Sequence, residues 1–322
     1  MLDLLTRVYP STPITKRSIL NKTRFYSGVR FFVRHSANAI LPLYFKLNNT
    51  FTKKHRLTGT GKDELIVTFT SFPARIDRVW LVVESIFRQT HKPDRLILWL
   101  SREQFATLEV LPENLLRQQE RGLEIRLVDG DLRSYKKYYY TLKEYPDSDW
   151  IIIDDDVFYS SDLVSNLVAN SKKNSNAIIF NRGHRLVYKD SILLPYSIWE
   201  PLTELTKPSL DIFATGVGGV LYPAHSLHDE ALNMNAFLKF CPLADDVWLY
   251  VATRLNNTKL LKTNEQRLFV PILNKMNITL TSENVAQGLN DQQIDQVRAY
   301  LKENHYDLFD ESELRSNCTS LL

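Results

Sequence analysis

Four apolar segments rich in β-branched residues begin about thirty residues apart, near positions 64, 95, 123 and 150. Residues with apolar side chains at helical spacing lie between them. A repeat of this length is typical of a βαβ unit, in which consecutive strands are parallel and a helix packs back onto the sheet. We therefore predict an α/β fold with a Rossmann-like, mostly parallel sheet that is flanked by helices.

The predicted elements have recognisable boundaries. The helix after the second strand has Pro112 at its start and Gly122 just past its end, the positions that these residues favour. The strands are expected at Glu64–Ser71, Arg95–Ser101, Leu123–Asp129 and Trp150–Asp154, with helices over 76–87, 112–122 and 134–145. No internal repeat interrupts this order.

Three consecutive aspartates, Asp154, Asp155 and Asp156, follow the fourth strand. Ligands of open α/β sheets gather at the carboxyl ends of the strands. Because side chains alternate along a strand, we expect Asp154 and Asp156 to face a common point and Asp155 to point elsewhere. Three like charges repel one another unless a cation such as Mg²⁺ or Mn²⁺ lies between carboxylate and phosphate oxygens. The alternative is a turn or helix-cap role.

Two later motifs also attract attention. Gly216, Gly218 and Gly219 place three of the ten glycines within four positions, which favours close approach of the backbone to a ligand over a bulged edge strand. Asp245 and Asp246 begin an apparent helix, where acids often serve only as caps.

The charge distribution separates an N-terminal arm from the rest. Residues 1 to 58 contain eleven Lys and Arg residues and a single acid, Asp3, so the remaining chain is net negative. We place the boundary at 57–61, which gives a basic amphipathic arm over 1–60 and one domain over 61–322. Aromatic and basic residues mix in this arm, which indicates peripheral contact with an anionic membrane surface through residues 1–58. An irregular arm packed on the domain and a transit peptide are the alternatives.

The low count of two cysteines, Cys241 and Cys318, suits a reducing compartment, so we expect the protein to be cytoplasmic. This expectation includes peripheral binding to the inner face of the cell membrane. No run of 18 apolar residues is present.

Six segments together resemble bacterial nucleotide-sugar glycosyltransferases of GT-A fold, of the kind found in capsule and surface-polysaccharide gene sets. They are VTFTSFPARI, SIFRQTHKPDRLILWLS, DLRSYKKYYYTL, WIIIDDDVFY, GVGGVLYP and CPLADDVWLY, in this order. The resemblance covers about residues 63 to 300 and leaves the basic arm outside.

The resemblance implies a nucleoside-diphosphate sugar donor, with UDP expected, and a divalent cation, Mn²⁺ or Mg²⁺. Asp156 is the implied metal ligand, with Asp154 on the metal or the ribose and Asp155 beside the donor. The nucleoside should lie against Thr70, Ser71 and Phe72.

Further donor contacts follow by the same resemblance. Arg75 would pair with a phosphate. Lys137 would reach the diphosphate and Lys136 would be solvated. Asp131, in a second acid-Gly-acid motif after the third strand, is expected in a turn with a nucleoside contact.

The resemblance also places the segment around Gly218 and Gly219 beside the sugar and the acceptor. Asp246, with Asp245 as second choice, is the implied general base that takes a proton from an acceptor hydroxyl. Transfer would then invert the anomeric centre. The acceptor would be a surface glycan, either free or linked to a lipid. We expect no nucleic-acid partner.

Three alternatives remain open at this stage. The acids could serve a two-metal nucleotidyltransferase or phosphohydrolase, although the segment TSFPARI is not a phosphate loop. Some retaining glycosyltransferases of this fold use a late histidine as a further metal ligand, but we expect ordinary structural or solvent-exposed roles for His184, His225 and His228. The third alternative is a binding protein without activity, which the acids at both 154–156 and 245–246 disfavour.

Overall fold

The computed structural model describes residues 1–9, 25–51, 55–57, 65–190, 192–264, 269–274 and 289–306. Most of the predicted boundary at 57–61, as well as Cys318, lies outside the described residues. The helices are α1 (Leu2–Val8), α3 (Phe25–Phe51), α4 (Ile76–Phe87), α5 (Glu113–Leu116), α6 (Lys136–Glu144), α7 (Leu163–Lys173), α8 (Met234–Phe240), α9 (Asp245–Leu255) and α11 (Leu289–Glu303).

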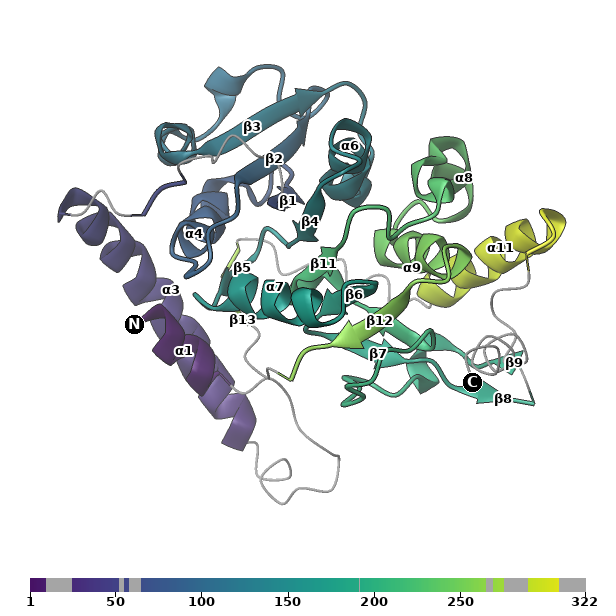
Figure 1. Ribbon diagram of the computed structural model, residues 1–322. Helices are drawn as coiled ribbons and strands as arrows, with labels where there is room; N and C mark the ends of the chain where they lie inside the picture. The colour runs from purple at the N-terminus through teal and green to yellow at the C-terminus, as the bar shows by residue number, and fades with distance from the viewer. Residues whose placement is uncertain are drawn as a thin grey trace.

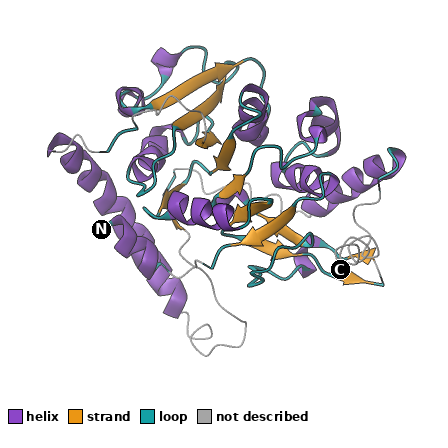
Figure 2. Ribbon diagram, viewed as in Figure 1, coloured by secondary structure: helices purple, strands orange, loops and turns teal. Residues whose placement is uncertain are grey.

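A seven-stranded sheet forms the centre of the molecule, in the order β12-β6-β11-β4-β1-β2-β3 (Figures 1 and 2). Its strands are β1 (Leu65–Thr70), β2 (Arg95–Ser101), β3 (Leu123–Val128), β4 (Asp149–Ile152), β6 (Ala177–Phe180), β11 (Val220–Tyr222) and β12 (Lys259–Lys262). All neighbours pair in parallel except β11, which is antiparallel to β4 and β6. The predicted fold class is confirmed, because this α/β sheet is mostly parallel and flanked by helices.

Three short two-stranded pairings complete the described strands. They are β5 (Val157–Tyr159) with β13 (Phe269–Pro271), β7 (Gly183–Arg185) with β10 (Ile212–Ala214), and β8 (Tyr188–Lys189) with β9 (Ile192–Leu193).

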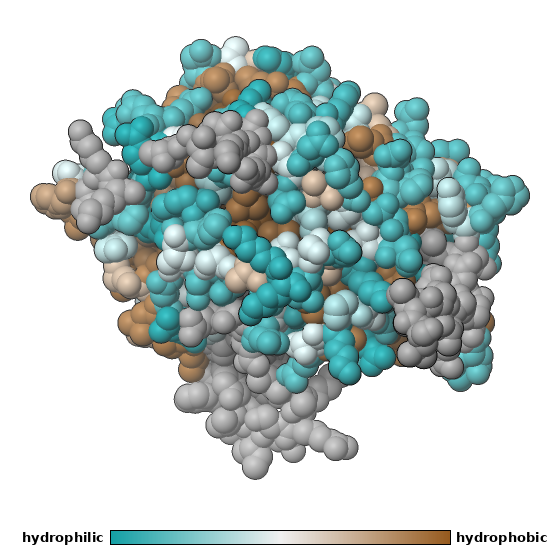
Figure 3. Space-filling model, in the orientation of Figure 1, coloured by the Kyte–Doolittle hydropathy of each residue, from teal (hydrophilic) through white to brown (hydrophobic). Residues whose placement is uncertain are grey.

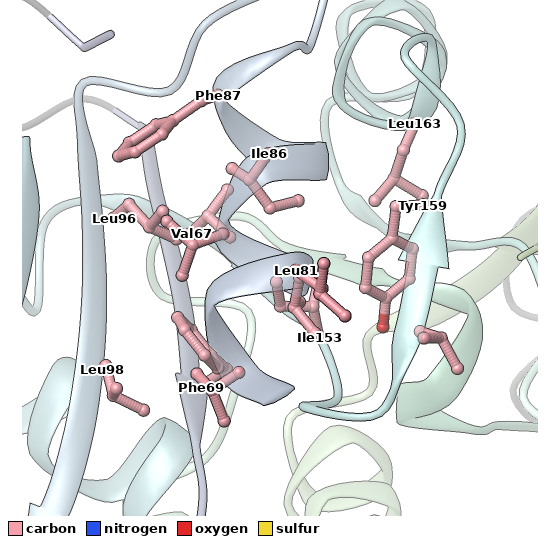
Figure 4. Close-up of a cluster of buried hydrophobic side chains, with 14 of the residues drawn as sticks. Val67, Phe69, Leu81, Ile86, Phe87, Leu96, Leu98, Ile153, Tyr159 and Leu163 are labelled. Atoms are coloured by element: carbon pink, nitrogen blue, oxygen red, sulfur yellow. The ribbon is translucent and has the colours of Figure 1, made fainter. Parts of the chain in front are cut away.

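Alternation along each central strand divides the core between the two faces of the sheet. Val67 and Leu96 belong to one cluster, which includes side chains of α3, α4 and α7 (Figure 4). Their neighbours Ile66 and Ile97 belong to the other, which includes side chains of α6, α8, α9 and α11. Tyr138 of α6 is buried in this second cluster.

The segment 25–51 of the basic arm is a helix of 27 residues, α3, that continues through Pro42. The alternative of an irregular arm packed on the domain is therefore wrong about the irregularity of this segment, but the segment does pack on the domain. Ala37, Leu41 and Phe45, spaced four residues apart, are fully buried in the same cluster as α4. Their burial makes α3 part of the core.

The opposite face of α3 remains exposed and partly apolar. Phe31, Phe32, Leu43 and Phe51 are all more than half exposed. Hydrophobic surface is visible along the edge that α1 and α3 form at the left of Figure 3. Within the described residues, no helix is both long and apolar enough to cross a membrane.

A chain of hydrogen bonds connects α3 to the aspartate segment. Asn38 donates from Nδ2 to the Pro271 carbonyl oxygen at 3.0 Å, and its Oδ1 accepts from the Leu273 N–H at 2.8 Å. Between them, the Ile272 N–H donates to the Asp156 carbonyl oxygen at 2.7 Å. The backbone at Asp156 is thus held by residues that α3 itself holds.

Candidate functional site

A cavity of about 640 Å³ opens where β1, β4 and β6 end. Because these strands are parallel, their carboxyl ends share one edge of the sheet. Strand β11 runs the opposite way, so the glycine segment before it reaches the same edge. The lining includes Thr70, Ser71, Phe72, Arg75, Asp131, Lys137, Asp154, Asp155, Asp156, Asp245 and Asp246. All predicted site residues except Gly218 and Gly219 are therefore brought together.

The aspartates are arranged differently from the prediction. Strand β4 ends at Ile152 and the chain bends at 155–156, so strand alternation does not reach the acids. Asp155, expected to point elsewhere, accepts hydrogen bonds from Ser71 Oγ at 2.5 Å and Arg75 Nη1 at 2.7 Å. The same Arg75 nitrogen lies 3.0 Å from Asp156 Oδ2. One guanidinium therefore holds two of the three carboxylates.

Arg75 compensates only part of this negative charge. Burial raises the pKa of Asp155, although Arg75 opposes the shift. Burial, followed by repulsion from Asp155, raises the pKa of Asp156 to about 7. Arg75 already contacts two carboxylates. Its predicted contact with a phosphate would therefore be made in addition to these two ion pairs.

Lys137 connects the first group of acids to the second. Its Nζ lies 2.8 Å from Asp245 Oδ2 and 3.3 Å from Asp154 Oδ1. Burial alone would lower the pKa of Lys137, but Asp245 and Asp154 raise it well above its ordinary value. A buried, permanently charged ammonium thus lies between the two acidic segments.

Lys136 is buried, so the expectation that it is solvated is wrong. Its ammonium contacts Asp131, which also accepts from Gln104 Nε2 at 2.6 Å and from the Arg133 N–H at 2.9 Å. Asp131 organises the turn after β3, in which Gly130 has a φ of 75°. Its turn role is confirmed, and the nucleoside contact stays a prediction.

Asp246 does not cap its own helix. Helix α9 begins at Asp245 with Ala244 as N-cap and no capping hydrogen bond from a side chain. The carboxylate of Asp246 instead accepts from the Gly216 N–H, with distances of 3.3 and 3.4 Å to its two oxygens. Burial, followed by repulsion from Asp245, raises the pKa of Asp246 to about 7. A carboxylate with this pKa is suited to accept a proton near neutral pH.

Gly218 and Gly219 do not line the cavity, which corrects their predicted contact with the ligand. A Cβ on Gly218 would lie 2.8 Å from Arg182 Cβ and 3.0 Å from its backbone nitrogen. Gly219 has a φ of +81°, and its Cβ would lie 3.0 Å from Leu163 Cδ1. The glycines are required by close packing within the protein, since side chains would collide there.

His184 and His228 have structural roles and His225 is exposed to solvent, as expected. His184 accepts from the Leu202 N–H at 3.4 Å, and burial followed by Arg182 lowers its pKa to about 4. His228 caps a short 3₁₀ helix by accepting from the Glu230 N–H, and His225 is exposed beside Asp147. None of the three lines the cavity.

The sequence interpretation missed Arg182, Thr215 and Tyr196, which line the cavity on the side of α9. Arg182 comes two residues after the apolar strand β6, the same signal that identified the aspartates after β4. Tyr196 begins a short 3₁₀ helix, Tyr196–Ile198, and its N–H donates to Asp291 Oδ1 at 2.6 Å. That bond links the segment of Tyr196 to the start of α11.

The acids of the cavity can be tested for their ability to hold a divalent cation. Within the described residues, no group of three or more His, Cys, Asp or Glu side chains is placed to hold a metal ion. Mg²⁺ commonly uses only one or two carboxylates and takes its other ligands from water and substrate phosphates. The raised pKa of Asp156 reflects burial first and repulsion from Asp155 second, and a bound cation would offset both by favouring the ionised carboxylate. The residues therefore fit a cation that binds together with a phosphorylated ligand.

No family model matches the chain, and a search of curated proteins finds no match. Among solved structures, it is similar to the mannosyltransferase PcManGT from Pyrobaculum calidifontis, described in complex with GDP-Man and Mn²⁺. The identity is 12%, the TM-score 0.48, and the coverage 92% of this chain and 76% of that one.

Two further similarities are weaker. S. aureus TarS is 11% identical with a TM-score of 0.45, covering 73% of this chain and 65% of that one. UTP-bound UGPase from Acinetobacter baumannii is 8% identical with a TM-score of 0.37, covering 63% and 86%. Likenesses at these scores decide nothing about the substrate of this chain.

Proposed function

We propose that the protein is a metal-dependent glycosyltransferase of GT-A type, which transfers a sugar from a nucleoside diphosphate, UDP foremost, to a hydroxyl of a surface-glycan acceptor. One observation carries this proposal: the acids after β4 and the acids that begin α9 line one cavity and are bridged by Lys137. The first group suits a cation and a diphosphate, and the second offers a base with a raised pKa.

The donor would lie along the carboxyl edge of the sheet. Thr70, Ser71 and Phe72 would contact the nucleoside, and Asp156 with Asp154 would hold Mn²⁺ or Mg²⁺ beside the diphosphate. The cation, when bound, would neutralise charge on the departing phosphate. Arg75 positions Asp155 and Asp156, and Lys137 positions Asp154.

The acceptor would enter from the side of α9. Asp246 would take the proton of the acceptor hydroxyl as its oxygen bonds to the anomeric carbon and the bond from that carbon to the diphosphate breaks. The nucleoside diphosphate leaves on the opposite face, so the anomeric centre inverts. The Gly216 N–H, which donates to Asp246, would keep the carboxylate in place.

A two-metal phosphohydrolase or nucleotidyltransferase is the alternative. Such an enzyme would need protein ligands for two ions.

The donor proposal is tested by calorimetric titration of UDP, GDP and their sugars with and without Mn²⁺. We expect Asp156→Ala to abolish the Mn²⁺-dependent part of binding. Asp129→Asn, which alters an almost fully exposed acid nearby, is the matched control and should leave it unchanged. Nucleotide binding that resists EDTA would contradict the metal role.

Asp246→Asn should bind the donor normally but lose transfer, and retained turnover would remove Asp246 from the base role.

We also propose that the exposed face of α1 and α3 rests on an anionic membrane, on the inner face of the cell membrane. Exposed Phe31, Phe32 and Leu43 accompany Arg30 and Lys46 on α3, a composition suited to an anionic interface. A larger fraction of the protein should sediment with vesicles of phosphatidylglycerol than with vesicles of phosphatidylcholine alone. Phe31→Ser with Phe32→Ser should remove that difference, and equal sedimentation of the wild type with both vesicles would refute it.

A further inference from the structure

Arg182 differs from the other cations that line the cavity. Arg75, Lys136 and Lys137 each lie within ion-pair distance of a carboxylate. In the part of the chain that the structure describes, Arg182 forms no such pair. Its guanidinium donates from Nη1 to Thr215 Oγ1 at 2.9 Å, and it lines the cavity. A guanidinium carries five N–H donors, so most of its donor capacity remains for a ligand.

The glycine segment fixes the position of Arg182. The Thr215 N–H donates to the Arg182 carbonyl oxygen at 2.9 Å, and Thr215 Oγ1 donates to the same oxygen at 3.1 Å. Gly218 packs so closely on the Arg182 backbone that a Cβ there would collide with it. Gly216, two residues earlier, donates its N–H to Asp246. One short segment therefore positions both Asp246 and Arg182, which accounts for glycines that do not themselves touch the cavity.

Arg182 lies away from the nucleoside end of the cavity. It follows β6, which is separated from β4 by β11, whereas Thr70 and Ser71 follow β1 on the other side of β4. With strands about 4.8 Å apart, β6 is on the order of 10 Å from β4 and 15 Å from β1. Thr215 contacts Arg182, and Tyr196 and Asp246, which also line the cavity, lie close enough to affect its pKa. This is the part of the cavity where, under the proposed function, the two sugars meet.

The electrostatics of Arg182 agree with this placement. Burial lowers the pKa of Arg182, and the nearby Tyr196, Asp246 and Asp154 oppose the shift without reversing it. By contrast, the pKa of Arg75 is raised: burial would lower it, but Asp155 and Asp156 more than compensate. The charge of Arg182 is therefore incompletely balanced by the protein.

We propose that Arg182 binds an acidic group, a carboxylate or a phosphate, on a sugar substrate, and so selects acidic over neutral sugars. The inference rests on the proposed function for the identity of the ligand as a sugar. Two sources of the acidic group share this chemistry, the acceptor and the transferred sugar of the donor. A planar guanidinium can donate two parallel hydrogen bonds to either kind of acid.

Titrations monitored by ligand-observed NMR distinguish these sources. In the acceptor arm, the protein saturated with UDP is titrated with glucuronate, glucose 6-phosphate and glucose. In the donor arm, UDP-glucuronate is compared with UDP-glucose. We expect the wild type to prefer the acidic ligand in one arm, and Arg182→Gln to weaken that ligand about tenfold or more, as loss of a charge-assisted pair implies.

The controls separate this proposal from folding and from the proposed function. Arg185→Gln changes an exposed arginine of the same segment outside the cavity and should leave every titration unchanged. Arg182→Lys retains the charge and should keep part of the preference, and thermal unfolding confirms that each variant is folded. UDP affinity should be the same in Arg182→Gln as in the wild type.

The outcomes are distinct. An equal loss of UDP affinity would assign Arg182 to the donor diphosphate and overturn the proposal. Equal binding of acidic and neutral ligands by the wild type, or an acidic preference that survives Arg182→Gln, would also overturn it. If UDP fails to bind the wild type, the proposed donor is wrong, whereas titration of glucuronate against glucose without nucleotide still tests Arg182.

Discussion

Replacement of Lys137 by Met tests whether the bridge between the two acidic segments holds the site together. The ammonium lies 2.8 Å from Asp245 and 3.3 Å from Asp154, and the Lys137 side chain is only 7% exposed. Methionine has a similar length and flexibility, so Lys137→Met removes the charge with little loss of packing. The variant leaves Asp245 buried beside Asp246 with no cation between them and Asp154.

The expected loss of unfolding free energy follows from this geometry. Removal of one partner from a buried ion pair typically costs about 3–5 kcal/mol, because the other charge is left uncompensated. Asp245 is buried and contributes fully, whereas Asp154 is 31% exposed and partly screened by water. We therefore expect a loss near the lower limit, about 3 kcal/mol at pH 8.

The pH dependence of this loss has a defined sign. The pKa of Asp246 is already raised to about 7, and the nearby Lys137 opposes that shift, so loss of the ammonium should raise this pKa further. A carboxyl with a raised folded pKa stabilises the fold when protonated, and this stability is lost as pH rises through that pKa. Lys137 itself has a raised pKa and stays charged throughout the neutral range. The difference between variant and wild type should therefore shrink as pH falls from 8 towards 5.

Urea unfolding followed by tryptophan fluorescence and circular dichroism measures the effect. Lys143→Met, which removes an exposed lysine from the same helix, is the matched control and should change stability little. Lys137→Met combined with Asp245→Asn should recover much of the lost stability, since the stranded charge is gone. A loss below about 1 kcal/mol, or a double variant no more stable than Lys137→Met, would refute the reasoning.

Three further predictions concern the base, the glycine segment and α3. Because Asp246 must be ionised to accept a proton and its pKa is about 7, kcat/KM should rise with pH through that value and then level off; a flat profile in a transfer assay would contradict this. Gly219→Ala should cost about 1–3 kcal/mol in thermal or urea unfolding, since its φ of +81° and the contact with Leu163 disfavour a Cβ, and unchanged stability would refute that explanation. Phe45→Ala should cost about 3–5 kcal/mol in the same assay, whereas Phe51→Ala, at 82% exposed, should cost little; equal effects would show that α3 is not packed as described.

The sequence predicted the central strands well because their apolar runs are bounded by clear turn signals. The second strand occupies Arg95–Ser101 as predicted, and the first and third differ from the prediction only at their ends. The placement of the three aspartates followed from one rule, that parallel strands end at a common edge. Arg75, Lys137, Asp245 and Asp246 were expected at the same site only through the family resemblance.

Other features depended on contacts that sequence spacing does not encode. The orientation of Asp155 depends on a bend after Ile152, and the burial of Lys136 depends on Asp131 in the preceding turn. Helix α3 was missed because Pro42 and the abundant basic residues hid the four-residue spacing of Ala37, Leu41 and Phe45. The role of Gly218 is decided by Arg182, which lies far from it in the sequence.

The hydrogen bonds of Asn38 to Pro271 and Leu273 limit which N-terminal arms could replace the present one. Because the Ile272 N–H in turn donates to the Asp156 carbonyl oxygen, helix α3 and the segment 269–274 support one point from two ends of the chain. The partners of Asn38 in that segment are backbone groups, which do not depend on the side chains there. A chimera with the arm of another protein would therefore keep these bonds only if its helix supplied a carboxamide at the position of Asn38.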